Sequence, residues 1–193
     1  MVTVQKNYII LLCEHITLKV IIFIKTVTFA SYQNEGECTM EVIRFGRRNN
    51  VYYCFSNFYP CTIEYEGLTY NSVEVAFQAA KTLSRDERIP FTKMSPGFAK
   101  RNGRKLNLRT DWEEVKISIM KELIVAKSKS CPEFTKQLVS TEGKGIIEDT
   151  TGWHDNIWGS CSCEKCKYKW KHNNLGKILM EVRDEILSQF DLL

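Results

Sequence analysis

The sequence predicts a helix-rich α+β protein with a small β-sheet. Segments rich in β-branched and aromatic residues are few, and they lie early in the regularly patterned part of the chain, soon after residue 40. Apolar residues at helical spacing carry most of the pattern further on. The 193 residues hold no internal repeat and suit one domain with a real core. We therefore expect a single compact domain.

The strand and hairpin patterns come first. EVIRFG at 41–46 and VYYCFSNF at 51–58 predict strands, and TIEYEGLTY at 62–70 predicts a hairpin with Glu66 and Gly67 at its turn. Apolar residues then recur at helical spacing, which predicts a helix from about Ser72 to Ser84. A short helix is expected near Phe98–Asn102 in an otherwise polar, basic segment.

Three more helices are expected in the second half. Thr110 with Glu113, and Ser130 with Glu133, have the spacing of a capping box before an apolar stripe. The last helix has one clear stripe, formed by Leu175, Ile178, Leu179, Val182 and Ile186. The segment 143–173 between these helices is rich in turn residues and is expected to be irregular.

The first 40 residues differ from the rest. Charged residues interrupt the apolar run YIILLCEHITLKVIIFIKTVTFA, so no uncharged stretch reaches the roughly 18–20 residues that a bilayer crossing needs. The segment is either an accessory piece that packs on the domain or the product of an upstream start codon, with Met40 as the true start. We favour the second interpretation, and expect a leader over 1–40, a domain over 41–193 and no membrane association.

Charge and cysteine usage narrow the class of protein. A formal net charge of +4 suits a phosphorylated substrate and is too weak to indicate duplex DNA binding. Five of the eight cysteines are scattered singly and three crowd into CSCEKC. A secreted disulfide scaffold is normally shorter and more evenly stapled, so we expect reduced thiols and a cytoplasmic protein.

The polar side chains of two segments could line a pocket. Glu74, Gln78 and Lys81 share one helix face, although such rows are more often solvated. In GWHDNIWG, two tryptophans bracket Asp155 and offer stacking faces for a base; the alternative is a structural loop in which Asp155 caps a turn.

Other polar residues have similar alternatives. Asn57 in FSNFYP either binds a ligand or, more commonly, satisfies a turn. A basic segment suits phosphate or pyrophosphate, or is simply a solvated loop. Its cations are Lys93, Lys100, Arg101, Arg104, Lys105 and Arg109.

The cysteine-rich segment is a candidate zinc site. Cys161, Cys163 and Cys166 offer three thiolates, and structural zinc usually takes four ligands. The fourth is missing locally, although His172 is near in sequence and Cys54 or Cys61 could come from afar. The alternative is a hairpin of free thiols.

Five segments together resemble the NADAR (YbiA-like) family in order and spacing. They are FSNFYP, YNSVEVAFQAAK, SPGFAKRNGRKLNLRTDWEEVK, DNIWG and NNLGKILMEVR, and they span about Val42 to Leu187. Each is weak alone, whereas five in register are specific. The resemblance implies a compact, mostly helical YbiA-like α+β domain. In one departure, Val75 stands where many members carry histidine after the motif glutamate.

The resemblance also implies an activity. Family members include N-glycosidases that split early riboflavin-pathway intermediates into a pyrimidine and ribose 5-phosphate, and others remove ADP-ribose from guanine bases in nucleic acid. The implied catalytic residues are Glu74 and Asp155. The substrate-binding residues suggested by the family and the patterns above are Asn57, Phe58, Gln78, Lys81, Arg104, Trp112 and Trp158.

Cleavage of a ribose C1′–N bond builds positive charge at C1′, which a carboxylate stabilises. We assign this role to Glu74, and to Asp155 the protonation of the base or orientation of the water. This chemistry requires no cofactor and no metal; the candidate zinc on CSCEKC would have a structural role only.

The expected partner is a small phosphoribosyl or ADP-ribosyl substrate, or ADP-ribosylated nucleic acid. One alternative is a non-catalytic ADP-ribose- or NAD-binding module, which would not need paired acids. Another is a zinc-dependent nucleic-acid or protein adaptor, which would leave Glu74, Gln78 and Lys81 unexplained.

Overall fold

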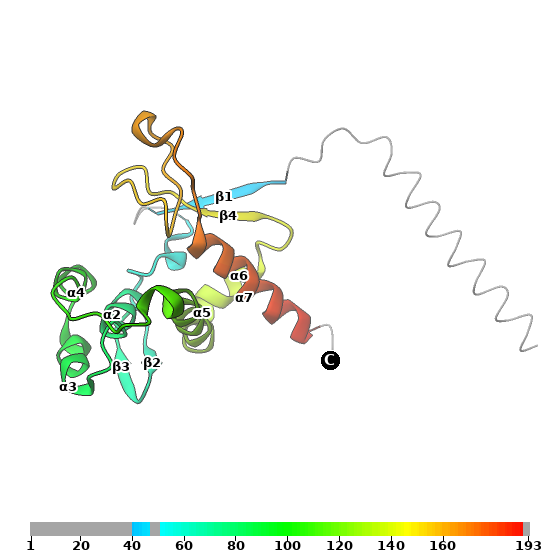
Figure 1. The fold of residues 1–193 in the computed structure, drawn as a ribbon. Coiled ribbons are helices and arrows are strands. Elements are labelled where there is room, and N and C mark those ends of the chain that lie inside the picture. The colour runs from blue at the N-terminus through cyan, green and yellow to red at the C-terminus, as the bar shows by residue number, and fades with distance from the viewer. Residues whose placement is uncertain (1–39, 47–50, 191–193) are drawn as a thin grey trace, which may run out of the picture. The chain divides into compact units, whose positions relative to one another are not determined.

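The computed structural model of the chain describes residues 40–46 and 51–190. Six α-helices and two small two-stranded sheets lie within these residues (Figure 1), which confirms the helix-rich α+β class. The leader expected over 1–40 lies, up to Thr39, outside the described residues. Among the described helices, none combines the length and apolar character that a membrane crossing requires.

The first sheet joins segments that are far apart in sequence. β1 (Val42–Phe45) runs parallel to β4 (Gly145–Glu148), with Phe45 opposite Glu148. β1 was predicted, whereas the expectation of irregular structure over all of 143–173 is wrong at β4. In a parallel pair the carboxyl ends of both strands meet at one edge, so Gly46 and Glu148 lie close together there.

The second sheet is the predicted hairpin. β2 (Ile63–Tyr65) pairs antiparallel with β3 (Leu68–Tyr70). Glu66 (φ 46°) and Gly67 (φ 71°) both adopt the left-handed region, as a tight two-residue hairpin turn requires. This prediction is confirmed.

The strand expected at 51–58 is wrong. Its centre is a short 3-10 helix, η1 (Tyr53–Phe55), whose amides bond locally: Phe55 N donates to Tyr52 O at 3.0 Å and Ser56 N to Tyr53 O at 3.0 Å. Phe55 is fully buried and packs edge-on against Phe45. The aromatic pattern that suggests a strand therefore reflects core packing.

The central helix α2 (Val73–Ala79) is buried at every position, and Ser72 caps it by accepting a hydrogen bond from Val75 N. It ends earlier than the predicted Ser84, because Ser84 is instead the N-cap of the next helix, α3 (Arg85–Arg88). η2 (Ile89–Lys93) then leads to α4 (Pro96–Gly103), which matches the short helix expected there.

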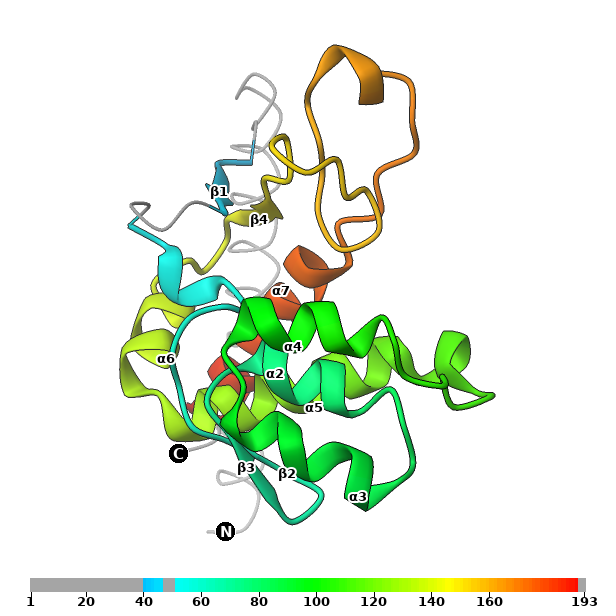
Figure 2. The ribbon, with the colours of Figure 1, turned by 90° about the vertical axis from the view of Figure 1, so that its left-hand side faces the viewer.

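α4 lies alongside α2 and packs against it (Figure 2). A Cβ at Gly103 would stand 2.1 Å from Gln78 Oε1, so glycine at this position allows the two helices to approach closely.

The remaining helices pack together: α5 (Trp112–Ser130), α6 (Pro132–Val139) and α7 (Asn174–Phe190). The α7 stripe is buried from Leu175 to Val182, as predicted, and it packs against β4 and α5. Together with α2 and the sheet residues, these helices enclose the core.

Both predicted capping boxes are wrong. Asp111 precedes α5, and Arg109 holds its carboxylate through two bonds of 2.6 and 2.9 Å. Ser130 is the last residue of α5, and Cys131 precedes α6. The spacing of the residues was right for a box, but each helix begins one residue later than the box would require.

One lysine of α5 is fully enclosed. Lys127 Nζ donates to Ser56 O at 2.9 Å and lies 4.8 Å from the ring centroid of Phe134. Burial lowers the pKa of this ammonium to about 8. The side chain thus ties α5 to the segment that carries Ser56 and Asn57.

We expect Lys127→Ala to lower the free energy of unfolding by about 2–4 kcal/mol, because it leaves a cavity and removes the hydrogen bond from Lys127 Nζ to the Ser56 carbonyl. Urea denaturation followed by circular dichroism measures this. The matched control is Lys129→Ala, an exposed lysine on the same helix, with an expected change within about 0.5 kcal/mol. Equal losses in the two variants would contradict the assignment.

Candidate active site

A cavity of about 630 Å³ lies where α2, α4 and the start of α5 meet the carboxyl end of the β1–β4 pair and the loop 149–158. This is the size of a typical small-molecule site. The structure brings all nine residues with expected catalytic or substrate-binding roles to its wall: Asn57, Phe58, Glu74, Gln78, Lys81, Arg104, Trp112, Asp155 and Trp158.

Glu74 enters the cavity from the first turn of α2 and is only 6% exposed. Its backbone N–H donates to Asn57 O at 2.9 Å, and its Oε1 accepts a 3.0 Å hydrogen bond from Gln78 Nε2. The alternative of a solvated helix face is therefore wrong for Glu74 and Gln78. Burial raises the pKa of Glu74; Lys100, the Gln78 hydrogen bond and Lys81 oppose this rise.

Two amide oxygens at the wall lack a partner among the described side chains and backbone. They are Asn57 Oδ1 and Gln78 Oε1, both buried. The other end of Asn57 is engaged, because its Nδ2 approaches Met120 Sδ at 3.5 Å. Buried polar atoms nearly always have a partner, so this pair suits a ligand that brings hydroxyl or N–H donors.

Aromatic rings form one side of the cavity. The Phe77 ring lies 5.0 Å from Trp112 and 5.2 Å from Trp158, edge-on to the latter. Lys81 Nζ lies 5.8 Å from the Trp112 ring centroid. Such surfaces suit a planar base.

Asp155 shapes the loop that completes this wall. Its Oδ1 accepts hydrogen bonds from Ile157 N at 2.8 Å and Trp158 N at 3.0 Å. The turn-capping interpretation of Asp155 is thus correct, and it coexists with a place in the cavity. One of its two carboxylate oxygens is therefore already hydrogen-bonded to backbone amides.

A second enclosed carboxyl, Glu148, was missed by sequence reasoning. It ends β4, beside Gly46, and lines the cavity. Burial raises its pKa to about 7; Asp155 and Glu74 raise it further, and Lys100 opposes them. The available signal was an acid directly after the apolar pair of GIIE, since ligands often bind at the carboxyl ends of parallel strands.

Cations face these acids. Lys100 on α4 and Arg104 at its end line the cavity, and Lys100 Nζ stands 5.6 Å from the Phe58 ring centroid. Lys116 joins them from α5. The rest of the basic segment does not line it, and Arg109 is paired with Asp111. The positive charge along this side of the cavity suits a phosphate.

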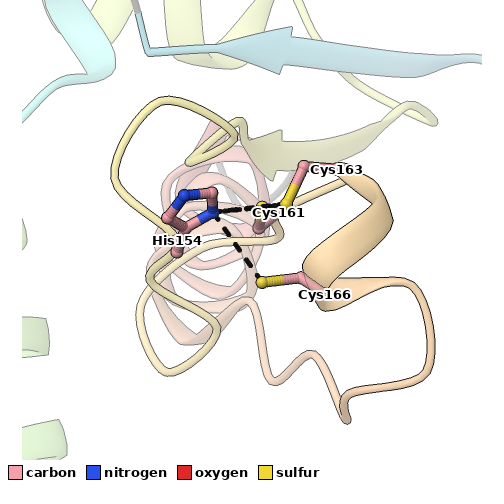
Figure 3. A group of neighbouring side chains, drawn as sticks. All are labelled: His154, Cys161, Cys163 and Cys166. Carbon is pink, nitrogen blue, oxygen red and sulfur yellow. Dashed lines mark hydrogen bonds between the residues drawn. The ribbon is translucent and has the colours of Figure 1, made fainter.

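The three thiols predicted as metal ligands come together, and the fourth group beside them is His154 (Figure 3). Its Nδ1 lies 3.4, 3.2 and 3.9 Å from the sulfurs of Cys161, Cys163 and Cys166. The expectation that His172, Cys54 or Cys61 would complete the set is wrong. This is a His/Cys cluster of a kind that can hold a metal.

The chain belongs to the NADAR family: the NADAR domain matches residues 44–187. It is 33% identical over 148 residues to N-glycosidase YbiA of Escherichia coli strain K12, covering 75% of this chain and 88% of that protein. It is 34% identical to N-glycosidase Npun_R5314 of Nostoc punctiforme, covering 73% and 90% of the two chains.

Two further similarities bear on fold and context. The NMR structure of E. coli YbiA superposes with a TM-score of 0.67 at 31% identity, covering 77% of this chain and 86% of that one. The chloroplastic riboflavin biosynthesis protein PYRR of Zea mays is 32% identical over 166 residues; the match covers 76% of this chain and a quarter (25%) of that protein. The expected family and YbiA-like fold are confirmed.

Proposed function

We propose that this chain hydrolyses the bond between a base nitrogen and C1′ of ribose in a phosphorylated ribosyl substrate. The expected enzyme class, a hydrolase acting on N-glycosyl bonds, is confirmed by the curated relatives named N-glycosidase. The observation that carries the proposal for this site is the pair of enclosed carboxyls, Glu74 and Glu148, in one cavity with aromatic rings and cations.

Glu74 acts as the ionised carboxylate. The Gln78 hydrogen bond and the nearby Lys81 and Lys100 favour its charged form. When the glycosidic bond breaks, positive charge develops at C1′, and a carboxylate facing that carbon stabilises it. The same group accepts a proton from the attacking water.

Glu148 supplies the proton to the departing base. Two like charges in one enclosed site oppose each other, so near neutral pH one carboxyl keeps its proton. Glu148 is the better candidate, because Asp155 and Glu74 both favour its neutral form. Asp155, predicted earlier as this acid, accepts two backbone hydrogen bonds and instead orients the loop and the water.

The other wall residues hold the substrate. Trp112 and Trp158 flank the base. Lys81 and Arg104 contact phosphate, with Lys100 and Phe58 beside them. The unpaired oxygens of Asn57 and Gln78 accept hydrogen bonds from ribose hydroxyls.

A hydrolysis assay tests this function. The full chain is offered a phosphoribosylaminopyrimidine and ADP-ribosyl-guanosine in parallel, and products are followed by HPLC and mass spectrometry. Release of ribose 5-phosphate or ADP-ribose establishes the glycosidase and identifies its substrate. Binding of ADP-ribose in a calorimeter, with no product from either compound, would replace it with the binding-module alternative.

One observation favours ADP-ribosylated guanine in a single strand of nucleic acid. Beyond the cysteine cluster, aromatic residues alternate with lysines, and Tyr168 is 93% and Trp170 79% exposed. The lysines are Lys167, Lys169 and Lys171. Exposed rings among cations are the usual platform for stacking unpaired bases.

Removal of the two exposed rings should separate the substrate classes. We expect Tyr168→Ala/Trp170→Ala to raise KM for an ADP-ribosylated single strand at least about 30-fold, since each of the two lost stacking contacts contributes about 1–3 kcal/mol. KM for ADP-ribosyl-guanosine itself should not change. Equal KM changes for strand and nucleoside would contradict strand recognition.

A cytoplasmic site of action remains part of the proposal, supported by the free thiols of the described residues.

A further inference from the structure

The His154, Cys161, Cys163 and Cys166 cluster has the dimensions of a tetrahedral metal site. A zinc ion holds sulfur at about 2.3 Å and nitrogen at about 2.0–2.1 Å, so a tetrahedron places ligand atoms about 3.5–3.8 Å apart. The observed Nδ1–sulfur distances are 3.2–3.9 Å, and Cys161 Sγ lies 3.3 Å from Cys163 Sγ. All four ligand atoms lie within 4.8 Å of one another.

The four groups come from two segments that the backbone holds together. Ser160 N donates to Glu148 O at 2.8 Å, which places Cys161 beside the end of β4. Cys161 N donates to Asn156 Oδ1 at 3.0 Å. η3 (Glu164–Cys166) then turns the Cys166 sulfur back toward His154 (Figure 3).

We propose that these four residues bind one Zn²⁺ ion and that the ion fixes the loop 153–158 against the wall of the cavity. Three thiolates and an imidazole are soft and intermediate ligands in the set that zinc favours. With four protein ligands the coordination sphere is closed, so the ion has a structural role and takes no part in hydrolysis. Binding displaces the thiol protons, because thiolates are the ligands.

Competing explanations of the cluster fit less well. A disulfide requires sulfurs about 2.05 Å apart, and Cys161 and Cys163 are 3.3 Å apart. A hairpin of unconnected thiols gives no reason for three sulfurs and a ring nitrogen to converge. The His154 ring points toward the sulfurs (Figure 3), and its backbone has φ 60°, in the left-handed region.

The location of His154 links the metal to the cavity. Its two sequence neighbours, Trp153 and Asp155, both line the cavity. Asp155 in turn accepts the amides of Ile157 and Trp158. Any effect of the metal on substrate binding rests on the proposed function. Metal binding and the ordering of the loop do not depend on it.

Metal analysis of the purified full chain tests the site. We expect one zinc per chain, and visible absorption of a tetrahedral cobalt–thiolate centre after exchange with Co²⁺. Removal of a partner that only orients a ligand weakens metal binding about 10- to 100-fold, so loss of a ligand should cost at least tenfold. His154→Ala should therefore weaken zinc at least that much in competition with a chromophoric chelator.

A matched control is available in His172→Ala, whose ring packs beside Trp170 outside the cluster. It should retain one zinc at the affinity of the unmodified chain. Equal affinities in the His154 and His172 variants would overturn the ligand assignment. A reduced chain that takes up no zinc when the ion is supplied would overturn the site.

Hydrogen exchange tests the effect on the loop without reference to catalysis. After chelation, the amides of Ile157 and Trp158 should exchange faster, while those of α7 keep their rates. Unchanged exchange in 149–158 on metal removal would overturn the positioning role. If zinc binds and orders the loop but no substrate is cleaved, the proposed function fails and the metal site stands.

Discussion

Glu74→Gln is expected to lower kcat by about 10²–10⁴-fold with little change in substrate affinity. The amide has nearly the same shape and can still accept the hydrogen bond from Gln78 Nε2. It carries no negative charge to stabilise the ribosyl cation and cannot take a proton from water. Single-turnover hydrolysis gives the rate, and calorimetry gives the affinity.

The same change should not weaken the fold. Burial raises the pKa of Glu74, so ionisation at neutral pH costs stability in the folded state, and this cost is absent in Gln. Melting temperature at pH 7 should therefore be equal or higher. Glu64→Gln, an exposed glutamate on β2, is the matched control and should keep full activity. A Glu74→Gln enzyme that retains full turnover would refute the assignment.

Two local patterns predicted their elements correctly. The Glu66–Gly67 turn marks its hairpin because the two-residue turn needs left-handed backbone at both positions. The α7 stripe marks its helix because Leu175, Leu179 and Val182 must face one side to reach the core. In both cases the residues that determine the element lie within it.

Long-range pairing escaped prediction. β4 has only four residues, and its partner β1 lies about a hundred positions earlier in the chain. Nothing within GIIE distinguishes a buried parallel strand from a turn-rich segment. Glu148 was not predicted for the same reason, because it reaches the cavity only through the pairing of β4 with β1.

The candidate site was predicted in part for a similar reason. Helical spacing placed Glu74 and Gln78 on one face, but it could not show that the face is buried. That depends on α4, which approaches closely because Gly103 has no side chain. Likewise three cysteines were visible in CSCEKC, whereas His154 joins them only through the fold of its loop.

Glu148→Gln should remove the alkaline limb of the pH–rate profile. Because the pKa of Glu148 is about 7 and its acid form donates the proton, kcat/KM of the unmodified chain should fall about tenfold per pH unit above pH 7. The glutamine variant should be about 10²–10⁴-fold slower at pH 6 and lack this limb.

Glu148→Gln should lower the rate but raise the folding stability at alkaline pH. The folded pKa of Glu148 is raised, so its favourable contribution is complete below about pH 4.5 and is lost as pH rises through 7. At pH 8 the variant should be more stable than the unmodified chain by about 3 kcal/mol, with little difference at pH 4. Glu142→Gln, an exposed glutamate just before β4, should change neither property. If Glu148→Gln kept both its rate and its alkaline limb, the proton donor would have to be Asp155, the acid first predicted from the sequence.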